Sequence, residues 1–216
     1  MNDLPEGVRR RRFGDRQRLA TQGEPVYGEP VDASGWRVWD TNRSKVGALL
    51  QTHGDPGFDQ GAGVLYLGAA TGTTVSHLAD MGLCVYAVEL SPYAADSLLA
   101  VSASRPRLFP IIADARQPAA YSDIVEGELA WLIQDVASAQ QVQIAAANRR
   151  FLADDGRMLL FIKARSIDAT AEPDVVFTAV EAQLAESFEI TARVAMDATH
   201  RDHRALIGQV RTAQSQ

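Results

Sequence analysis

Short apolar runs recur along the chain, and most are followed by a segment with helical spacing or by a turn. Five such runs predict buried strands, at residues 64–67, 83–88, 107–113, 129–134 and 157–162. Helical patterns alternate with them, beginning at Thr73 and then spanning 91–103, 117–125, 140–152 and 173–186. Two further strand patterns, at 188–194 and 205–210, close the chain. This order predicts an α/β fold in which five parallel strands and a terminal antiparallel pair form a seven-stranded sheet.

Residues 1–40 have a different pattern, and we expect a basic arm and a small β subdomain ahead of a main domain at 41–216. Arginines cluster between Arg9 and Arg18, and we interpret them as a solvated arm in preference to a nucleic-acid contact. Short β-type runs at 25–27 and 36–39, separated by Gly, Pro, Asp and Ser, predict a hairpin. We expect Trp36 and Trp39 to pack this subdomain.

Two local signals concern where elements begin and end. A helix is expected to begin near Ser44-Lys45, with Asp40 or Asn42 as its N-cap. The run Asp154-Asp155-Gly156 predicts a turn before the fifth strand.

The stretch from Gly63 to Ser91 indicates a nucleotide site. An apolar strand leads into a turn that runs from Gly68 to Gly72, a helix follows, and the next strand ends in Glu89. Glycine lets such a turn approach a ligand, and an acid at the second strand end can bind two ribose hydroxyls. A dinucleotide fingerprint needs three glycines around a pyrophosphate, and this turn has only G-x-x-x-G. The pattern favours S-adenosylmethionine over NAD, with a dehydrogenase and an α/β domain that binds no nucleotide as the alternatives.

Ligands of an open α/β sheet bind outside the carboxyl ends of its strands. The residues at the five predicted ends share a polar character and are Gly68, Glu89, Asp114, Asp135 and Lys163. We expect Asp114 to lie where it can bind an adenine amino group. Of 21 basic residues, only Lys45 and Lys163 are lysines, and lysine, unlike arginine, can give up its proton. Both lysines are placed to converge on Asp135.

Composition narrows the class of protein further. The chain has 216 residues, a net charge of −6, one cysteine, Cys84, and 46% hydrophobic residues. No apolar run approaches the ~20 residues that span a bilayer, so we expect no membrane partner and a cytoplasmic location. The acidic balance argues against a free-standing nucleic-acid binder, since such proteins are usually basic.

Several motifs together resemble those of the fibrillarin family in its archaeal form. They are WDTNRSK at 39–45, LYLGAATGTTVSH at 65–77, YAVELS at 86–91, IADAR at 112–116, QDVA at 134–137 and IKARSID at 162–168. The resemblance covers about residues 26–210. It implies a class I S-adenosylmethionine methyltransferase with a Rossmann-like, seven-stranded sheet, which methylates ribose 2′-hydroxyls of rRNA or tRNA. It also implies a ribonucleoprotein that contains box C/D guide RNA, target RNA, a Nop-type scaffold protein and a kink-turn-binding ribosomal-type protein.

The resemblance also implies site residues. The expected catalytic set is Lys45, Asp135, Lys163 and His203. The expected cofactor contacts are Gly68, Ala69, Gly72, Thr73, Thr74, Glu89, Leu90, Asp114, Ala115, Asp135, Val136, Ala137 and Ser138, with no metal.

The chain departs from the family pattern in two places. Ser138 stands where the family usually has glutamine. The usual proline and tyrosine before the final histidine motif are missing, so His200 is a weaker alternative to His203. We expect His53 and His77 to be structural.

A ribose hydroxyl is a poor nucleophile, so its proton must leave as the oxygen attacks the methyl group. We expect Lys163 to be the base or to orient the hydroxyl, with burial and the Lys45 cation helping it to lose its proton. Asp135 would align the amines. Methylation of a protein glutamine and a purely structural role in the particle are the alternatives, although a scaffold would accept arginine in place of both lysines.

Overall fold

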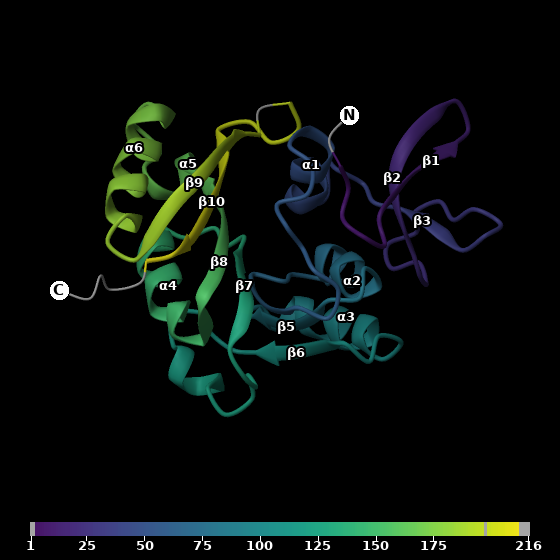
Figure 1. Ribbon diagram of the computed structural model, residues 1–216, viewed down its shortest axis with the longest axis horizontal. Helices are drawn as coiled ribbons and strands as arrows, with labels where there is room; N and C mark the ends of the chain where they lie inside the picture. Colours follow the sequence, from purple (N-terminus) through teal and green to yellow (C-terminus); the bar gives the residue numbers. More distant parts are fainter. Residues whose placement is uncertain (1–2, 197, 212–216) are drawn as a thin grey trace.

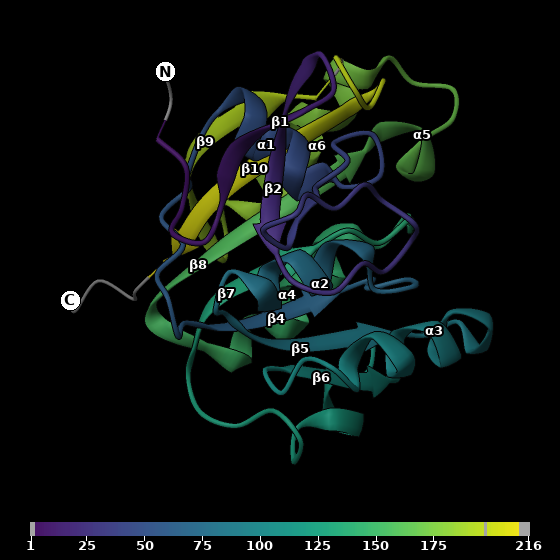
Figure 2. The same cartoon turned by 90° about the vertical axis from the view of Figure 1, so that its right-hand side faces the viewer.

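The computed structural model describes residues 3–196 and 198–211, and a seven-stranded sheet runs through its centre (Figure 1). Its strand order is β6-β5-β4-β7-β8-β10-β9, and Figure 2 shows the strands stacked in this order from β6 at the bottom. The strands are β4 (Gly63–Leu67), β5 (Cys84–Glu89), β6 (Leu108–Ile112), β7 (Leu129–Gln134), β8 (Leu152–Lys163), β9 (Phe188–Ala195) and β10 (His203–Val210). The first five are parallel, and β10 is antiparallel to β8 and β9. The predicted fold class is confirmed.

Helices cover both faces of this sheet because its strands are apolar on both sides. Val64 and Tyr66 pack in one core cluster, whereas Leu65 and Leu67 pack in the other. The first cluster includes residues of α1 (Lys45–Thr52), α2 (Thr73–Asp80) and α3 (Pro92–Ser102). The second includes residues of η1 (Pro118–Tyr121), α4 (Gln141–Asn148), η2 (Arg149–Phe151), α5 (Ala164–Ile167) and α6 (Pro173–Leu184). No helix of the described residues is long and apolar enough to cross a membrane.

The N-terminal residues form a three-stranded antiparallel sheet, β1 (Arg9–Phe13), β2 (Arg16–Gln22) and β3 (Trp36–Val38). The expected arm is instead an ordered hairpin, because Arg9–Phe13 pairs along its whole length with β2, and the arginine side chains remain exposed or half-buried. The hairpin turn is Gly14-Asp15, and Gly14 takes a φ of 59°, which glycine adopts without strain. Residues 25–27, expected to be a strand, lie in the loop before β3.

Other element boundaries differ for local reasons. Ser44, not Asp40 or Asn42, caps α1, and its hydroxyl accepts a hydrogen bond from Gly47 N. The expected turn at 154–156 lies inside β8, where a register shift lets the strand continue. The predicted helix at 117–125 is a single 3-10 turn, and α5 was not predicted because it spans only four residues.

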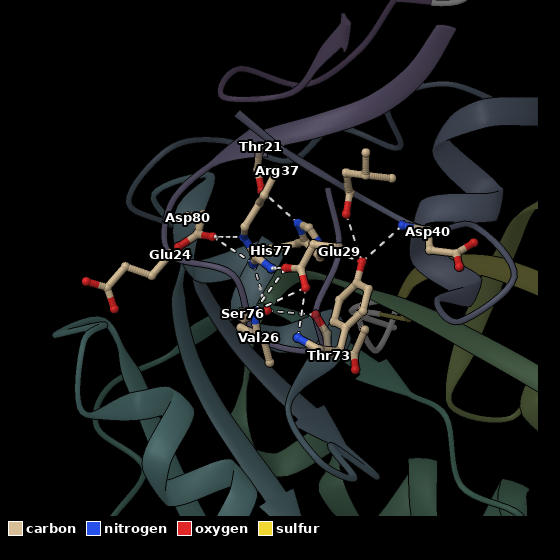
Figure 3. Close-up of polar contacts among 12 residues, drawn as sticks. Thr21, Glu24, Val26, Glu29, Arg37, Asp40, Thr73, Ser76, His77 and Asp80 are labelled. Atoms are coloured by element: carbon tan, nitrogen blue, oxygen red, sulfur yellow. Dashed lines mark hydrogen bonds and ion pairs between the residues drawn. The ribbon is translucent and has the colours of Figure 1, made fainter. Parts of the chain in front are cut away.

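A buried ionic network joins the N-terminal sheet to α2 (Figure 3). The Arg37 guanidinium on β3 donates hydrogen bonds to Glu29, Asp80 and the Ser76 hydroxyl, at 2.5, 2.8 and 2.7 Å. Its side chain is fully buried, and Asp80 also accepts from Arg105. Ser76 in turn donates to the Thr73 carbonyl in the first turn of α2. The network therefore holds the helix that starts at the glycine turn.

His77 is a structural residue of the same interface, as expected. It is fully buried and stacks on Trp39 with ring centroids 4.6 Å apart. Its Nδ1 lies 2.7 Å from the Thr21 hydroxyl and its Nε2 3.3 Å from the Tyr27 hydroxyl, which suits a neutral ring. Burial lowers the pKa of His77 well below its usual value, and the Arg37 and Arg105 cations lower it further. Trp39 thus packs in the main core, beyond the subdomain in which it was expected.

This neutral histidine predicts a pH dependence of stability. Because the pKa in the folded state is depressed, the contribution of His77 is complete above the unfolded value of about 6.5 and is lost as the pH falls below it. The loss amounts to roughly 1.4 kcal/mol per pH unit until the folded pKa is reached. We expect denaturant unfolding at pH 7.5 and 5.5 to show a larger loss for the natural chain than for His77→Gln. An equal loss in both proteins would contradict the assignment.

Candidate active site

Two adjoining cavities open at the carboxyl ends of the parallel strands. The first, here called the Glu89 cavity, has a volume of about 400 Å³ and lies beside β5 and β6. The second, the Thr73 cavity, has about 310 Å³ and lies beside the start of α2. Gly68, Ala70 and Asp135 line both, so they form one continuous site.

Most residues expected to bind the cofactor line these cavities. Those at the Glu89 cavity are Gly68, Glu89, Leu90, Asp114, Ala115, Asp135, Val136, Ala137 and Ser138. Those at the Thr73 cavity are Gly68, Ala69, Thr73, Thr74 and Asp135. The family motifs implied these positions, and Gly68, Glu89 and Asp135 among them stand at or directly after the end of a buried strand.

Sequence reasoning missed several lining residues. Ala70, Val88, Ala113, Arg116 and Ile144 also line the Glu89 cavity, and Arg43, Tyr66, Ala70 and Thr71 line the Thr73 cavity. Arg43 is the first residue of the Arg43-Ser44-Lys45 motif, and its place in that motif could have indicated that it lines the site. Tyr66 could not be predicted as a lining residue, because a tyrosine inside an apolar strand is expected to pack in the core.

Glu89 shapes the glycine turn as well as lining the cavity. Its carboxylate accepts hydrogen bonds from Ala70 N and Ser91 N, both at 2.7 Å. Ala70 has a φ of 47°, an unfavourable value for a residue with a side chain, and the bond to Glu89 holds it there. The Glu89 carboxylate at the end of β5 therefore stabilises the conformation of the glycine turn.

The two glycines of the turn are required by packing within the protein. Gly68 has a φ of 87°, and a Cβ there would lie 2.5 Å from the Asp135 carbonyl oxygen. Gly72 has a φ of 92° and is the N-cap of α2, and a Cβ there would lie 3.3 Å from Leu98 and Val101. The turn thus comes close to its neighbouring strand and to α3, a contact the sequence alone did not indicate.

Asp114 is engaged by a neighbouring arginine. Its carboxylate accepts hydrogen bonds from the side chain of Arg116 at 2.6 to 3.0 Å. The Arg116 guanidinium lowers the pKa of Asp114, so that this acid is ionised at neutral pH. Both residues line the Glu89 cavity, which gives this end an acceptor and a donor side by side.

Two of the four candidate catalytic residues, Lys45 and Asp135, meet at the junction of the two cavities. Lys45, the first residue of α1, places its Nζ 2.6 and 2.9 Å from the two carboxylate oxygens of Asp135. Lys163 ends β8 and is paired in register with His203, which begins β10. The predicted convergence of Lys45 on Asp135 is thus present as a direct ion pair.

Lys163 differs from its expected setting. Its side chain is exposed, so the expected burial is wrong. Within residues 3–196 and 198–211, no hydrogen bond or ion pair holds its amine. It nevertheless acts on His203, because its cation is among the charges that lower the pKa of that ring.

The two candidate histidines are side by side but bonded differently. Their ring centroids are 5.9 Å apart. His200 Nε2 lies 3.1 Å from the Thr41 carbonyl, whereas His203 Nδ1 lies 2.7 Å from the Arg201 carbonyl. Burial lowers the pKa of both rings, and the Lys45 cation lowers them further. His203 is therefore neutral at pH 7, with Nδ1–H donated to the backbone and Nε2 left as an acceptor.

Comparison with protein families shows to which family the chain belongs. The fibrillarin family model matches residues 6–212. The chain belongs to the fibrillarin family. A "Fibrillarin-like rRNA/tRNA 2'-O-methyltransferase" of Halobacterium salinarum is 50% identical, over 94% of this chain and 97% of that protein.

Solved structures of fibrillarins have the same fold. The structure of a fibrillarin/Nop5p complex superposes with a TM-score of 0.88 at 35% identity, over 97% of this chain and all of that one. Aeropyrum pernix fibrillarin, solved with natively bound S-adenosyl-L-methionine, gives a TM-score of 0.83 at 37% identity, over 95% of both chains. The chain thus matches these two fibrillarin structures over nearly their full length.

Proposed function

We propose that this chain transfers a methyl group from S-adenosylmethionine to the ribose 2′-hydroxyl of rRNA and tRNA. Its relatives carry this activity in their names. The observation that carries the proposal here is the Lys45–Asp135 ion pair, at the junction of two cavities in a fibrillarin fold. A dehydrogenase is no longer a competing interpretation, because residues 6–212 match the fibrillarin family model.

The residues that line the site suit the proposed cofactor. Glu89 can accept hydrogen bonds from two ribose hydroxyls, and Asp114 can accept from an adenine amino group. Thr73 begins α2, whose free N–H groups and dipole favour the carboxylate of a methionine moiety. When bound, S-adenosylmethionine supplies an electrophilic methyl group on a positively charged sulfur.

The remaining polar groups handle the proton of the ribose hydroxyl. Asp135 fixes the Lys45 ammonium, and its carboxylate favours positive charge at the junction of the cavities. Lys163 has no carboxylate partner among the described residues, so no ion pair holds it in the charged form. Its ammonium can orient the hydroxyl, and the amine takes the hydroxyl proton only after it has released its own proton to solvent. His203 is paired in register with Lys163, and its Nε2 is left as a hydrogen-bond acceptor. This favours His203 over His200 as the histidine of the catalytic set.

The chain is proposed to act inside a box C/D ribonucleoprotein. A structural relative was solved in complex with Nop5p, which supports a Nop-type scaffold partner. Box C/D guide RNA would select the target RNA, and a kink-turn-binding ribosomal-type protein would complete the particle. The net charge of −6 supports delivery of RNA by these partners, since repulsion slows the encounter of an acidic protein with a polyanion. The proposal includes a cytoplasmic location for this reaction.

Methyl transfer from labelled S-adenosylmethionine tests the function. The particle is assembled with and without guide RNA and scaffold protein, and mass spectrometry locates the label. We expect label on one ribose 2′-oxygen opposite the guide, only in the complete particle. Label on glutamine would indicate a protein methyltransferase, and no label in the complete particle would leave a structural subunit.

Cofactor binding has a sharp test at Glu89. We expect Glu89→Gln to weaken S-adenosylmethionine binding roughly 10- to 100-fold, because hydrogen bonds to a charged acceptor are lost in the cavity and in the turn. Isothermal titration calorimetry measures the affinity. Glu186→Gln, an exposed acid past the end of α6, is the matched control and should bind like the natural chain. Equal affinity of the two variants would contradict the role of Glu89.

A further inference from the structure

The N-terminal sheet has an outer face that carries arginines and an aromatic ring. Directly opposed residues of antiparallel strands share a face, and the register pairs Phe13 with Arg16 and Arg11 with Arg18. Leu19 belongs to the other face and is buried in the main core. These four residues therefore lie on the face opposite Leu19, with Arg16 exposed and the other three half-buried, on the hairpin that projects from the molecule in Figure 1.

Two cations of this face are unpaired. Arg11 is engaged, since it forms an ion pair with Asp32 and lies over the Trp36 ring. In contrast, Arg16 and Arg18 have no hydrogen bond or ion pair with any residue of the ranges 3–196 and 198–211. In a chain of net charge −6, a locally positive surface of this kind needs a negative partner.

A groove of about 530 Å³ runs from this hairpin toward the active site. Among the residues that line it are Phe13, Arg18, Tyr27, Glu29, Asp40 and Arg43. Its two acids already have partners. Glu29 is bonded to Arg37 and to Val26 N and Tyr27 N, and Asp40 accepts from Asn42. The charge of Glu29 is therefore compensated by Arg37, and the groove presents the two cations Arg18 and Arg43 against the single carboxylate of Asp40.

Arg43 connects this groove to the candidate active site. It lines both the groove and the Thr73 cavity, and it stands two residues before Lys45. Its guanidinium lies 4.8 Å from the centre of the Tyr27 ring. A chain seated in the groove therefore runs directly toward the Lys45–Asp135 pair.

We propose that the groove, together with Arg16 and Arg18, holds the phosphodiester backbone of the target RNA next to the ribose that is methylated. Arginine binds phosphate by paired, charge-assisted hydrogen bonds, and the half-buried rings of Phe13 and Tyr27 line the groove, where they can pack on ribose or bases. An acidic protein segment would use the arginines, but it would not need to reach the junction where the reacting ribose lies. The proposal rests on the proposed function, because it takes RNA as the substrate.

The test is the double variant Arg16→Gln/Arg18→Gln in the complete particle. Its matched control, Arg107→Gln/Arg150→Gln, removes the same charge before β6 and at η2, at the opposite edge of the sheet from the active site. We expect the groove variant to raise KM for target RNA about tenfold, with kcat and S-adenosylhomocysteine affinity unchanged. The dependence of RNA affinity on salt should also become shallower, because fewer counterions are released. The control should match the natural chain in each measurement.

Two results would overturn the proposal. One is a target-RNA KM within twofold of the natural chain. The other is a loss of affinity for the scaffold protein in the absence of RNA, which would make the face a protein interface. If the natural particle shows no methyl transfer, the proposed function fails. Fluorescence anisotropy then measures whether the groove variant binds the target RNA more weakly than the natural chain, which tests the groove separately from the activity. Thermal unfolding of the variant confirms that it folds.

Discussion

Replacing Lys163 with arginine will lower the rate constant of methyl transfer by at least about 100-fold. General base catalysis contributes 10²- to 10⁴-fold in enzymes, and a guanidinium cannot lose a proton at workable pH. The exposed amine of Lys163 has no carboxylate partner in the described parts of the chain, so no ion pair has to be broken for it to react. The variant keeps the positive charge, and therefore separates proton removal from electrostatic attraction.

The measurement is a single-turnover rate in the complete particle, so that product release does not enter. Lys163 lines neither described cavity, so the affinity for S-adenosylmethionine should stay within twofold of the natural value. Arg107→Lys, a distant exchange between the same two residue types, is the control and should leave the rate unchanged. A rate for Lys163→Arg above one tenth of the natural one would remove Lys163 from the reaction.

The two lysines are used differently from the arginines of this chain. Both lie at the carboxyl edge of the sheet, Lys45 bonded to Asp135 and Lys163 opposite His203. Arginine serves where a fixed cation must bind several partners, and Arg37 with its three acceptors is the example. The rarity of lysine was thus an informative signal in the sequence, because it separated these two positions from nineteen arginines.

The parallel sheet and the strand-end residues could be predicted from the sequence because both depend on local order. A buried strand is a continuous apolar run, and the first polar residue after it lies at the sheet edge, as Glu89 and Asp135 do. The N-terminal sheet could not be predicted in this way. Its β1 is a run of arginines that becomes a strand only through pairing with β2.

The buried network was invisible for a related reason. Glu29, Arg37 and Asp80 read as surface residues, since charged side chains are rarely buried unless they are paired. Their partners are separated by 8 to 43 positions in the chain, so no local pattern announces the pairing. These side chains come together only when β3 packs on α2, so the network becomes visible only in the contacts of the folded protein.

Arg37→Met will destabilise the fold by about 3–5 kcal/mol, the usual consequence of removing one partner from a buried ion pair. Methionine fills a similar volume, but it leaves the Glu29 carboxylate, whose side chain is 1% exposed, without its cation. Urea unfolding followed by circular dichroism measures the change. Arg193→Met, which breaks an exposed pair with Glu181, is the matched control and should cost under ~1 kcal/mol.

The same variant has a consequence for the active site. Arg37 holds Ser76, and Ser76 holds the Thr73 carbonyl at the edge of the Thr73 cavity. Folded Arg37→Met should therefore bind S-adenosylmethionine several-fold more weakly than the natural chain, whereas Arg193→Met should bind it equally well. Arg37→Lys keeps the positive charge but lacks the planar guanidinium that reaches three acceptors. Its free energy of unfolding should therefore lie between those of Arg37→Met and the natural chain. Unfolding free energies of Arg37→Met and Arg193→Met that agree within 1 kcal/mol would show that the network does not hold the N-terminal sheet on α2.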